Sequence, residues 1–504
     1  MSWTVTLTDA LSASPYRWTW ILRVIAVLDA PGDSSYVASS LPGIGDPIIG
    51  RMVRVNGAML KPGSWTTTLG VFSVELVGNL STFKQAVTRG TFLELLVGRP
   101  EWSDADYEVV AVGQAQQLTG KSPTQATLTC RDLLSALRSR PTTTAGQSAV
   151  GCRFTDITTT LTAGYTVGDS TISIADISGF ECGSAGTACL VTPTSGDPFI
   201  IKYTGVSGLD LTGVGATASH GTTASNAASG DVIQPILWIE GHPLNLIRRV
   251  MLSIDGSGAH GYDDLPEGDG LSLDYYWFDH ADTNTHYLLS EPSMSFELAE
   301  TEPIEDPWGW AQGWLAKGGF YLTIRQGLLT GRSAQPSTTS TFRDAAEITD
   351  DDIELGGASW EAWDQDSYTE AANVTVTSNN LNTNSSGVEN PATLPTFYRQ
   401  DYDLTSLLYS NETTGRLAVV GRVWEAHTRI PERYALSCMG LRLAVLAPGD
   451  FVRITSRQIA GRLSSTLDGL SSTRGIVTQV STDWGRGRVA LVVLVYPTSD
   501  GQFP

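Results

Sequence analysis

The sequence predicts a mainly β chain with a few short helices, divided into several β and α+β domains. Short runs in which apolar and polar residues alternate recur along the chain, separated by Gly, Pro or Asn, and this period of two is typical of antiparallel strands. Hydrophobic residues make up 41% of the chain, and 51 glycines accompany 14 tryptophans, as expected of packed domains with many turns. At roughly 100–200 residues per domain, the 504 residues correspond to about three to five domains.

Residues 1–153 are expected to form the first domain, a β-barrel or sandwich with one short helix. Its expected strands share the alternating pattern and span residues 3–7, 18–28, 65–69, 72–76, 91–97, 107–112 and 126–130. Leu133, Leu134 and Leu137 follow at helical spacing, and Pro141 ends the helix that they predict over residues 131–138.

Residues 154–236 are expected to form a small inserted β-domain. The segment is dominated by Thr, Ser, Gly and Ala, and Lys202 is the one positive residue between Arg153 and Arg248. Short β runs occur at residues 171–174 and 199–203. The small polar residues at 216–230 predict an exposed tip loop.

Residues 237–330 are expected to form a mixed α+β domain, and residues 331–434 a loop-rich β region. Pro243 in a first turn predicts a helix over residues 243–252, and a tryptophan-rich helix is expected at 305–317, before a strand at 320–324. Residues 262–271 predict an acidic, turn-rich loop, and the Asn, Ser and Thr of residues 375–395 predict an exposed loop.

Residues 435–504 are expected to form a second β-barrel. A turn at 448–450 precedes an expected strand at 451–455. Two further strands are expected at 475–480 and 488–495, and the two glycines between them suit a hairpin turn at 483–487.

The charge excludes some function classes. The formal net charge is −21 and the pI is about 4.6, which argues against static nucleic-acid binding, because phosphate neutralisation needs clustered Lys and Arg. No run of about eighteen apolar residues occurs, so we expect no membrane-spanning helix, and the first residues do not have the pattern of a signal peptide.

The five cysteines give no zinc spacing and no disulfide framework. Cys182 and Cys189 flank a Gly/Ala/Ser loop. This spacing is compatible with a hairpin disulfide and equally with two free thiols.

Motifs for catalysis are missing: the sequence has no GxSxG, HExxH, P-loop or GxGxxG pattern. The sequence GDS at 168–170 is similar to a hydrolase motif, but a plain turn is the favoured interpretation. His280 and His286, with Asp279 and Asp282 nearby, would suit a divalent metal, but a solvated polar loop is favoured.

For two further clusters we favour a structural role over a binding site. The three aspartates at 350–352 predict a helix start or a loop rather than a calcium site. The aromatic run at 275–278 could stack on a sugar, but a buried strand or a subunit interface is favoured. We therefore expect no catalytic residue, no cofactor and no metal site.

Four passages, in their order along the chain, resemble the tail hub or baseplate hub proteins of long-tailed bacteriophages. They are LTCRDLL at 128–134, FIIKYTG at 199–205, MLS at 251–253 with YDDLP at 262–266 and GL at 270–271, and LAPGDFVRIT at 446–455. Together they span most of the chain, and the order is more specific than any one passage.

The resemblance implies a virion protein, assembled in the host bacterial cytoplasm, that forms a homotrimer at the distal end of the tail. Residues 1–153 and 435–504 would be tail-tube-like barrels, the first borrowing strands from later in the chain, so three chains would continue a six-fold tube with six barrels. The implied partners are the distal tail protein, the tape-measure protein and tail fibre or tip proteins, without stable membrane insertion. DNA would pass through on ejection without specific binding, helped by the negative charge.

Three alternatives stay open. One is a distal tail ring or fibre-bearing baseplate adaptor protein, which would be hexameric. Another is a virion-associated hydrolase of cell wall or polysaccharide. The third, compatible with a hub, is receptor binding by the insertion at 154–235 or the segment 375–395.

Overall fold

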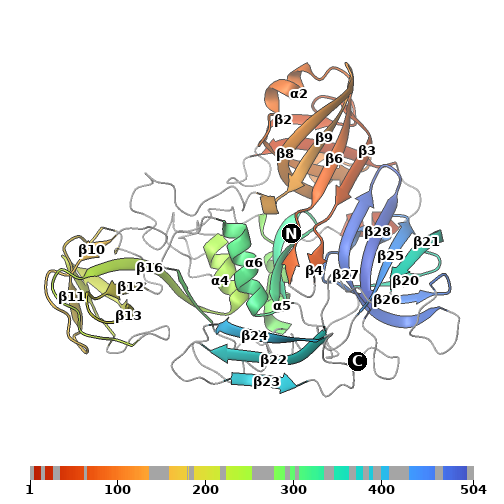
Figure 1. Ribbon diagram of the computed structural model, residues 1–504. Coiled ribbons are helices and arrows are strands. Elements are labelled where there is room, and N and C mark those ends of the chain that lie inside the picture. Colours follow the sequence, from red (N-terminus) through yellow and green to blue (C-terminus); the bar gives the residue numbers. More distant parts are fainter. Residues whose placement is uncertain are drawn as a thin grey trace.

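The computed structural model is mainly β, and its strands form several separate sheets (Figure 1). It describes residues 5–12, 17–25, 34–61, 65–135, 158–178, 180, 187–215, 223–251, 277–289, 296–300, 306–333, 345–361, 370–378, 385–389, 399–407, 431–459 and 469–495. The predicted fold class, mainly β with a few short helices, is confirmed. The domain limits expected from the sequence stay a prediction, as does the closure of barrels.

The largest sheet has two groups of strands. The N-terminal group has the order β2-β1-β7-β8-β9-β6-β3. Its strands are β1 (Thr19–Ile25), β2 (Ser34–Ser39), β3 (Ile49–Asn56), β6 (Val71–Val77), β7 (Phe92–Gly98), β8 (Glu108–Ser122) and β9 (Gln125–Asp132). Most were expected from alternation, and β6 shows why, since its residues alternate between buried and half-buried.

The C-terminal group has the order β27-β28-β25-β21, with β26 between β27 and β20. Its strands are β20 (Ala346–Thr349), β21 (Ile353–Glu361), β25 (Glu432–Met439), β26 (Phe451–Ser456), β27 (Leu470–Asp483) and β28 (Arg488–Val495). The expected hairpin turn is confirmed, because Asp483 pairs with Arg488. Two of these strands, β20 and β21, come from the region that the sequence predicts to be loop-rich.

The two groups join edge to edge, so that they form one continuous sheet of 13 described strands. Strand β27 pairs with β3 in the antiparallel sense, with Ser481 opposite Asn56 and Asp483 opposite Arg54. An ion pair of 2.9 Å between Arg54 Nε and Asp483 Oδ2 lies at this junction. One hydrophobic core cluster includes buried residues of both groups, among them Phe72 and Leu491.

The strand expected at residues 3–7 is wrong, because the chain forms helix α1 (Val5–Ser12) there. Leu7 and Leu11, one helical turn apart, are both buried in the shared core, and the Ser12 hydroxyl donates to the Thr8 carbonyl oxygen. Helix α1 packs against the 3₁₀ turn η4 (Arg442–Val445) of the C-terminal group. This tertiary contact outweighs a short local alternation.

Other short elements of the N-terminal group depart from expectation in detail. The strand expected at 65–69 shrinks to β5 (Thr66–Thr67), which pairs with β4 (Leu60–Lys61). The helix expected at 131–138 begins later, because β9 continues to Asp132, and the residues beyond 135 lie outside the described chain. Helix α2 (Ser81–Ala86) and the 3₁₀ turn η1 (Asp104–Asp106) connect the strands.

We call β10–β15 and the first half of β16 the insertion module. Strands β10 (Thr159–Thr160), β12 (Thr187–Thr192), β13 (Phe199–Tyr203) and β16 (Val232–Gly241) share one sheet, and β11 (Thr171–Ser173), β14 (Gly205–Ser207) and β15 (Asp210–Thr212) share another. The module has its own core cluster, and it projects from one side of the molecule (Figure 1). Strand β16 crosses residue 236 and pairs further on with β17 (Phe296–Glu300).

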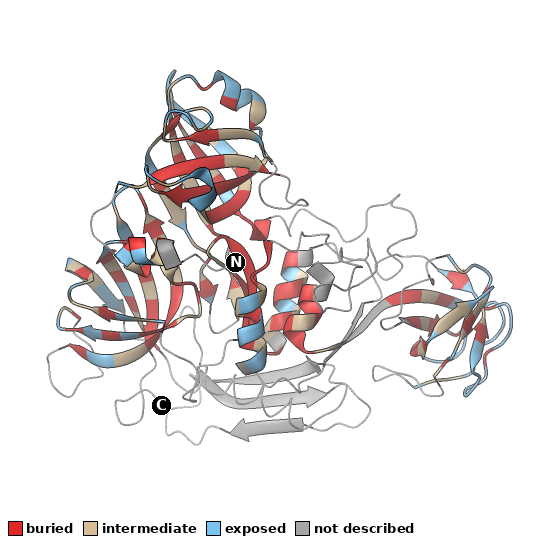
Figure 2. Ribbon diagram, turned by 180° about the vertical axis from the view of Figure 1, so that it is seen from behind, coloured by how far each residue is buried: buried red, intermediate tan, exposed pale blue. Residues whose placement is uncertain are grey.

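We call helices α4 (Pro243–Met251), α5 (His280–Leu289) and α6 (Pro307–Lys317), with the hairpin of β18 (Phe320–Arg325) and β19 (Leu328–Ser333), the middle layer. The predictions of α4, α6 and β18 are confirmed. Helix α6 begins with Pro307 after Asp306, whose carboxylate accepts from the Gly309 amide at 3.1 Å. All six residues of β19 are buried, and the centre of the molecule is correspondingly red in Figure 2.

The exposed loop expected at 375–395 is wrong in part. A three-stranded sheet occupies this region, with β22 (Glu370–Ser378) between β23 (Ser385–Glu389) and β24 (Arg399–Leu407). The β-branched residues of β22 have strand propensity, and its parallel partner β24 comes from outside the segment that the composition singled out. No described helix is long and apolar enough to cross a membrane.

Candidate functional site: a buried ion cluster in the middle layer

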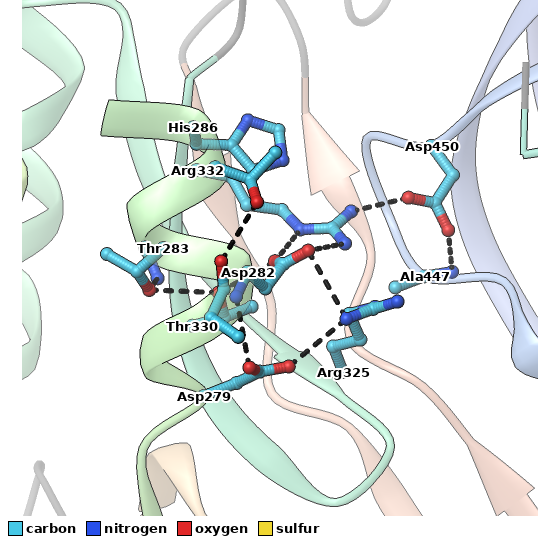
Figure 3. Close-up of polar contacts among 12 residues, drawn as sticks. Asp279, Asp282, Thr283, His286, Arg325, Thr330, Arg332, Ala447 and Asp450 are labelled. Atoms are coloured by element: carbon cyan, nitrogen blue, oxygen red, sulfur yellow. Dashed lines mark hydrogen bonds and ion pairs between the residues drawn. The ribbon is translucent and has the colours of Figure 1, made fainter. Parts of the chain in front are cut away.

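Five charged side chains meet where helix α5, hairpin β18–β19 and the turn at 447–450 come together (Figure 3). We call Asp279, Asp282, Arg325, Arg332 and Asp450 the ion cluster. Asp279 and Arg332 are almost completely buried, at 0% and 1% exposure. Because buried charges are stable only when they are paired and hydrogen-bonded, this arrangement depends on its exact partners.

Helix α5 places the acidic side of the ion cluster. Asp279 precedes the helix, and its Oδ1 atom accepts from the Asp282 amide at 3.1 Å, which is the geometry of an N-cap. The Asp279 amide donates to the Leu329 carbonyl oxygen at 2.7 Å, which ties the start of the helix to β19.

A tight hairpin places the two arginines. Gln326 and Gly327 connect β18 and β19 with positive φ angles of 52° and 79°, as a two-residue type I′ turn requires. Arg325 ends the first strand next to this turn, and Arg332 lies further along the second strand.

Arg332 bridges two distant parts of the chain. Its Nε and Nη2 atoms bind the two carboxylate oxygens of Asp282 at 2.7 and 3.0 Å, a bidentate pair. Its Nη1 atom binds Asp450 Oδ1 at 2.8 Å and donates to the Pro448 carbonyl oxygen at 3.1 Å. A single guanidinium therefore holds α5 against the C-terminal group.

Further contacts pair most of the other polar atoms, although Arg325 Nε is buried without a hydrogen-bond partner among the described residues. Arg325 Nη1 lies 3.2 Å from Asp279 Oδ2 and 3.4 Å from Asp282 Oδ1. The Thr330 hydroxyl donates to Asp282 at 2.8 Å, and His286 Nδ1 accepts from the Ser333 amide at 3.3 Å. These bonds are the reason that so many charges can stay inside the protein.

The pKa values follow from burial and from the arginines. Burial alone would raise the pKa of Asp282, but the charge and hydrogen bonds of Arg332 hold it well below its usual range. Burial, followed by the charge of Arg332, lowers the pKa of His286 to about 3. At neutral pH Asp282 is therefore ionised and His286 is a neutral acceptor.

The turn at 447–450 packs closely against this site. Asp450 Oδ2 accepts from the Ala447 amide at 2.7 Å, which leaves Oδ1 for Arg332. Gly449 has a φ of +91°, and a Cβ atom there would lie 1.6 Å from the Tyr321 hydroxyl oxygen. The glycine is therefore needed for both its conformation and its lack of a side chain.

The middle layer also contacts the N-terminal group. The Thr67 hydroxyl donates to the Leu322 carbonyl oxygen at 2.7 Å, and the Gln312 amide donates to the Thr67 carbonyl oxygen at 2.8 Å. A Cβ atom at Gly327 would lie 3.1 Å from the Val109 side chain, so the hairpin turn packs closely against β8. The middle layer is thus held by both groups of the large sheet.

The solvated-loop interpretation of residues 279–286 is wrong. His280 and His286 belong to helix α5, and the aspartates are neutralised by arginines. In the part of the chain that the structure describes, no three His, Cys, Asp or Glu residues are grouped to hold a metal ion.

Hydrogen bonds within the protein explain the GDS sequence and the three aspartates at 350–352. In the GDS sequence, Asp169 Oδ2 accepts from the Thr166 amide at 2.7 Å, and Gly168 has a φ of +101°, so the segment is a turn. The aspartates at 350–352 form the turn between β20 and β21. There Asp350 binds the Ser456 hydroxyl at 2.5 Å, and Asp352 pairs with Arg442 at 2.7 Å.

The structure describes part of the aromatic run at 275–278 and one of the two cysteines that flank the Gly/Ala/Ser loop. Trp277 and Phe278 are buried, and Phe278 makes a single bridge to Leu329 instead of a full strand, so neither ring can stack on a sugar. Cys189 is a buried free thiol, so it forms no disulfide. Residues 275, 276 and 262–271, together with Cys182, lie outside the described residues.

The sequence pattern indicates two of the three carboxylates of the ion cluster, Asp279 and Asp282, and neither of its arginines. Arg325 and Arg332 stand in an otherwise apolar stretch on either side of the Gln326-Gly327 turn, and this was the available signal. A charge within a strand that is otherwise apolar predicts a buried partner.

No protein-family model and no curated protein matches the sequence. Solved structures that are similar over nearly the full length include three tail proteins. One is the tail protein from Neisseria meningitidis MC58, with 10% identity, a TM-score of 0.42 and coverage of 97% of this chain and 100% of that chain. The 43 kDa tail protein of prophage MuSo2 from Shewanella oneidensis has 10% identity, a TM-score of 0.38 and coverage of 96% and 98%. The prophage tail protein gp18 from Listeria monocytogenes EGD-e has 6% identity, a TM-score of 0.40 and coverage of 94% and 94%. These are remote likenesses.

Proposed function

We propose that this chain is a structural virion protein that forms the homotrimeric hub at the distal end of a phage tail tube. In this role it continues the tube, anchors tip or fibre proteins and lets DNA pass on ejection. It meets the distal tail protein on one side and the end of the tape-measure protein in the lumen. It is assembled in the host cytoplasm, and its role is structural, not catalytic.

The observation that supports this proposal most strongly is the pair of strand groups in one chain. The N-terminal and C-terminal groups join through β3 and β27 into a continuous sheet. Three chains would therefore present six such groups, which is the number that a trimer needs to continue a tube of six-fold symmetry.

The ion cluster gives this arrangement the rigidity that a tube segment needs. Arg332 binds Asp450 of the C-terminal group, while Thr67 of the N-terminal group bonds to Leu322 of the same hairpin. The middle layer is thus fixed to both groups by buried polar contacts, which are costly to break.

Charge is consistent with passage of DNA. The chain carries a formal net charge of −21, so a lumen lined by three copies would repel phosphate unless its arginines were concentrated there. The low charged fraction, 17% against about 25% in ordinary domains, suits large interfaces with neighbouring proteins.

The proposal is tested by sedimentation equilibrium of the purified full-length chain, whose monomer mass is 53.9 kDa. We expect a particle of three times that mass. A hexamer would favour the distal ring or adaptor alternative, and a monomer at every concentration that can be reached would contradict the hub.

A separate assay addresses the hydrolase alternative. The purified chain is incubated with peptidoglycan and with capsule polysaccharide, and release of reducing ends is measured. We expect none above a boiled control. Turnover that a single carboxylate substitution abolishes would contradict a purely structural role.

A further inference from the structure

A large groove crosses one end of the junction between the two strand groups. It has a volume of about 1120 Å³, which exceeds the roughly 300–1,000 Å³ of small-molecule pockets, so a polypeptide surface fits it better. Its walls come from the start of β1, from β3, and from the turns that follow β25 and β27. We call it the arginine groove, after Arg17, Arg51, Arg442 and Arg486 in its walls.

The arginine groove has a positive balance of charge, because its lining holds four arginines and two aspartates, Asp351 and Asp352. Arg17 and Arg51 are exposed, and neither makes an ion pair with a residue that the structure describes. Arg486 is 63% exposed and lies 3.9 Å from Asp483, whereas Arg442 is paired with Asp352. On a chain with a net charge of −21, Arg17 and Arg51, without an ion pair to a described residue, mark a locally positive surface.

The groove also offers apolar surface beside these cations. Trp18 is half-buried and meets Trp484 edge to face, with the ring centroids 5.8 Å apart. Met439, another lining residue, is 55% exposed. An occupant with both carboxylates and exposed apolar side chains would match this surface.

The insertion module has that chemistry. Residues 154–236 contain seven acidic residues and one lysine. Asp169 and Asp197 are exposed, and Val167 and Leu209 expose 46% and 51% of their surfaces.

The module cannot occupy the groove of its own chain. Figures 1 and 2 both show it at the opposite side of the molecule from β25, β27 and β28, whose turns form the groove. A contact between two different surfaces of identical chains is heterologous, and such a contact closes into a ring when the rotation allows it.

We propose that the arginine groove of one copy binds the acidic insertion module of a second copy, and that this contact joins the copies of the trimer head to tail. The inference rests on the trimer of the proposed function and adds to it the surfaces that meet. It also gives the insertion module a role in assembly.

The test compares the dissociation constants of trimers by sedimentation velocity at low ionic strength. In the variant R17E/R51E we expect the dissociation constant to rise about tenfold or more, because two attractive charges become repulsive. The matched control is K84E/R89E, which makes the same change of charge at one exposed position in helix α2 and one just after it. Both lie outside the groove, so the constant should stay unchanged.

Charge exchange identifies the occupant. Asp197 and Asp210 make no side-chain bond to a described residue, and neither lies in the groove. D197R/D210R alone should also weaken the trimer, and the combination with R17E/R51E should restore at least part of the affinity. If reversal weakens the trimer and the exchange restores nothing, the module is not the occupant and the proposal is overturned.

The remaining outcomes separate the two proposals. A wild-type chain that stays monomeric contradicts both the hub and this contact. If the wild type forms a trimer and R17E/R51E weakens it no more than K84E/R89E does, the proposed contact is overturned and the hub stays intact. If R17E/R51E fails to fold, as judged by circular dichroism, the milder R17Q/R51Q replaces it, and the wild-type trimer should still weaken as salt rises.

Discussion

Arg332 and Asp450 are 118 residues apart in the sequence, yet Nη1 of the arginine lies 2.8 Å from Oδ1 of the aspartate. The same guanidinium binds both oxygens of Asp282 in helix α5. This contact ties the middle layer to the C-terminal strand group.

Removing the guanidinium should be strongly destabilising. In Arg332→Met, Asp282 and Asp450 keep their charges in the interior without their main partner, and we expect a loss of about 3–5 kcal/mol in the free energy of unfolding. Urea denaturation followed by tryptophan fluorescence measures it. Arg131→Met, at an exposed position of β9, is the control and should change stability by less than about 0.5 kcal/mol. A loss below about 1 kcal/mol in Arg332→Met would show that the ion cluster does not hold the layers together.

Gly449→Ala should be more harmful than an ordinary glycine substitution. The new Cβ atom would lie 1.6 Å from the Tyr321 hydroxyl, in addition to the strain of a φ of +91°. Gly440→Ala is the matched control, since its φ is +77° and nothing lies within 4 Å of the added atom. We expect the control to lose about 1 kcal/mol in the free energy of unfolding, and Gly449→Ala to lose at least about 2 kcal/mol more. Urea denaturation of the two variants and the wild type measures both losses. Equal losses would contradict the close packing of Tyr321 on this turn.

His286 should make stability depend on pH in acid. Its pKa is lowered to about 3 in the fold, against about 6.5 in an unfolded chain, so its contribution is complete above pH 6.5 and is lost as the pH falls toward 3. The unfolding free energy of the wild type, relative to His286→Gln, should fall by about 1.4 kcal/mol per unit between pH 6 and pH 4. Parallel curves for the two proteins would contradict a buried neutral imidazole.

Asp132 should give stability the opposite dependence on pH, with a loss as the pH rises. Burial raises its pKa to about 7, although the amides of Gly70, Leu134 and Ser135 lower it in part. Its contribution to stability is complete below about pH 4 and is lost as the pH rises to about 7. Asp132→Asn keeps an oxygen that can accept from Gly70, so we expect it to be more stable than the wild type by about 2–4 kcal/mol at pH 8 and by clearly less at pH 5. Thermal unfolding at both values tests this, and a variant less stable at pH 8 would refute it.

Much of the fold could be predicted because strand patterns are local. The strands β6, β26 and β28 alternate clearly, and their boundaries came out within a residue or two. The first helix was missed because five alternating residues at 3–7 outweighed Leu7 and Leu11, whose helical spacing becomes significant only once the C-terminal group covers them.

The candidate site could be predicted only in part, because its pairs are distant in the sequence. His286, Asp279 and Asp282 stand out as a local cluster, but Arg332 lies 50 residues beyond Asp282. Without that pairing, the same carboxylates look like metal ligands or a solvated loop. In the same way, the sequence predicts a loop-rich region where β20 and β21 lie, because their partner residues in β26 and β25 are 72–106 positions further on.

The most direct test of the central claim is the symmetry of this chain in an intact virion, seen by cryo-electron microscopy of the tail. The hub predicts three copies around the axis at the distal end, with the N-terminal and C-terminal strand groups alternating to give six units around the lumen. Six copies in one ring, or a single copy away from the axis, would contradict it.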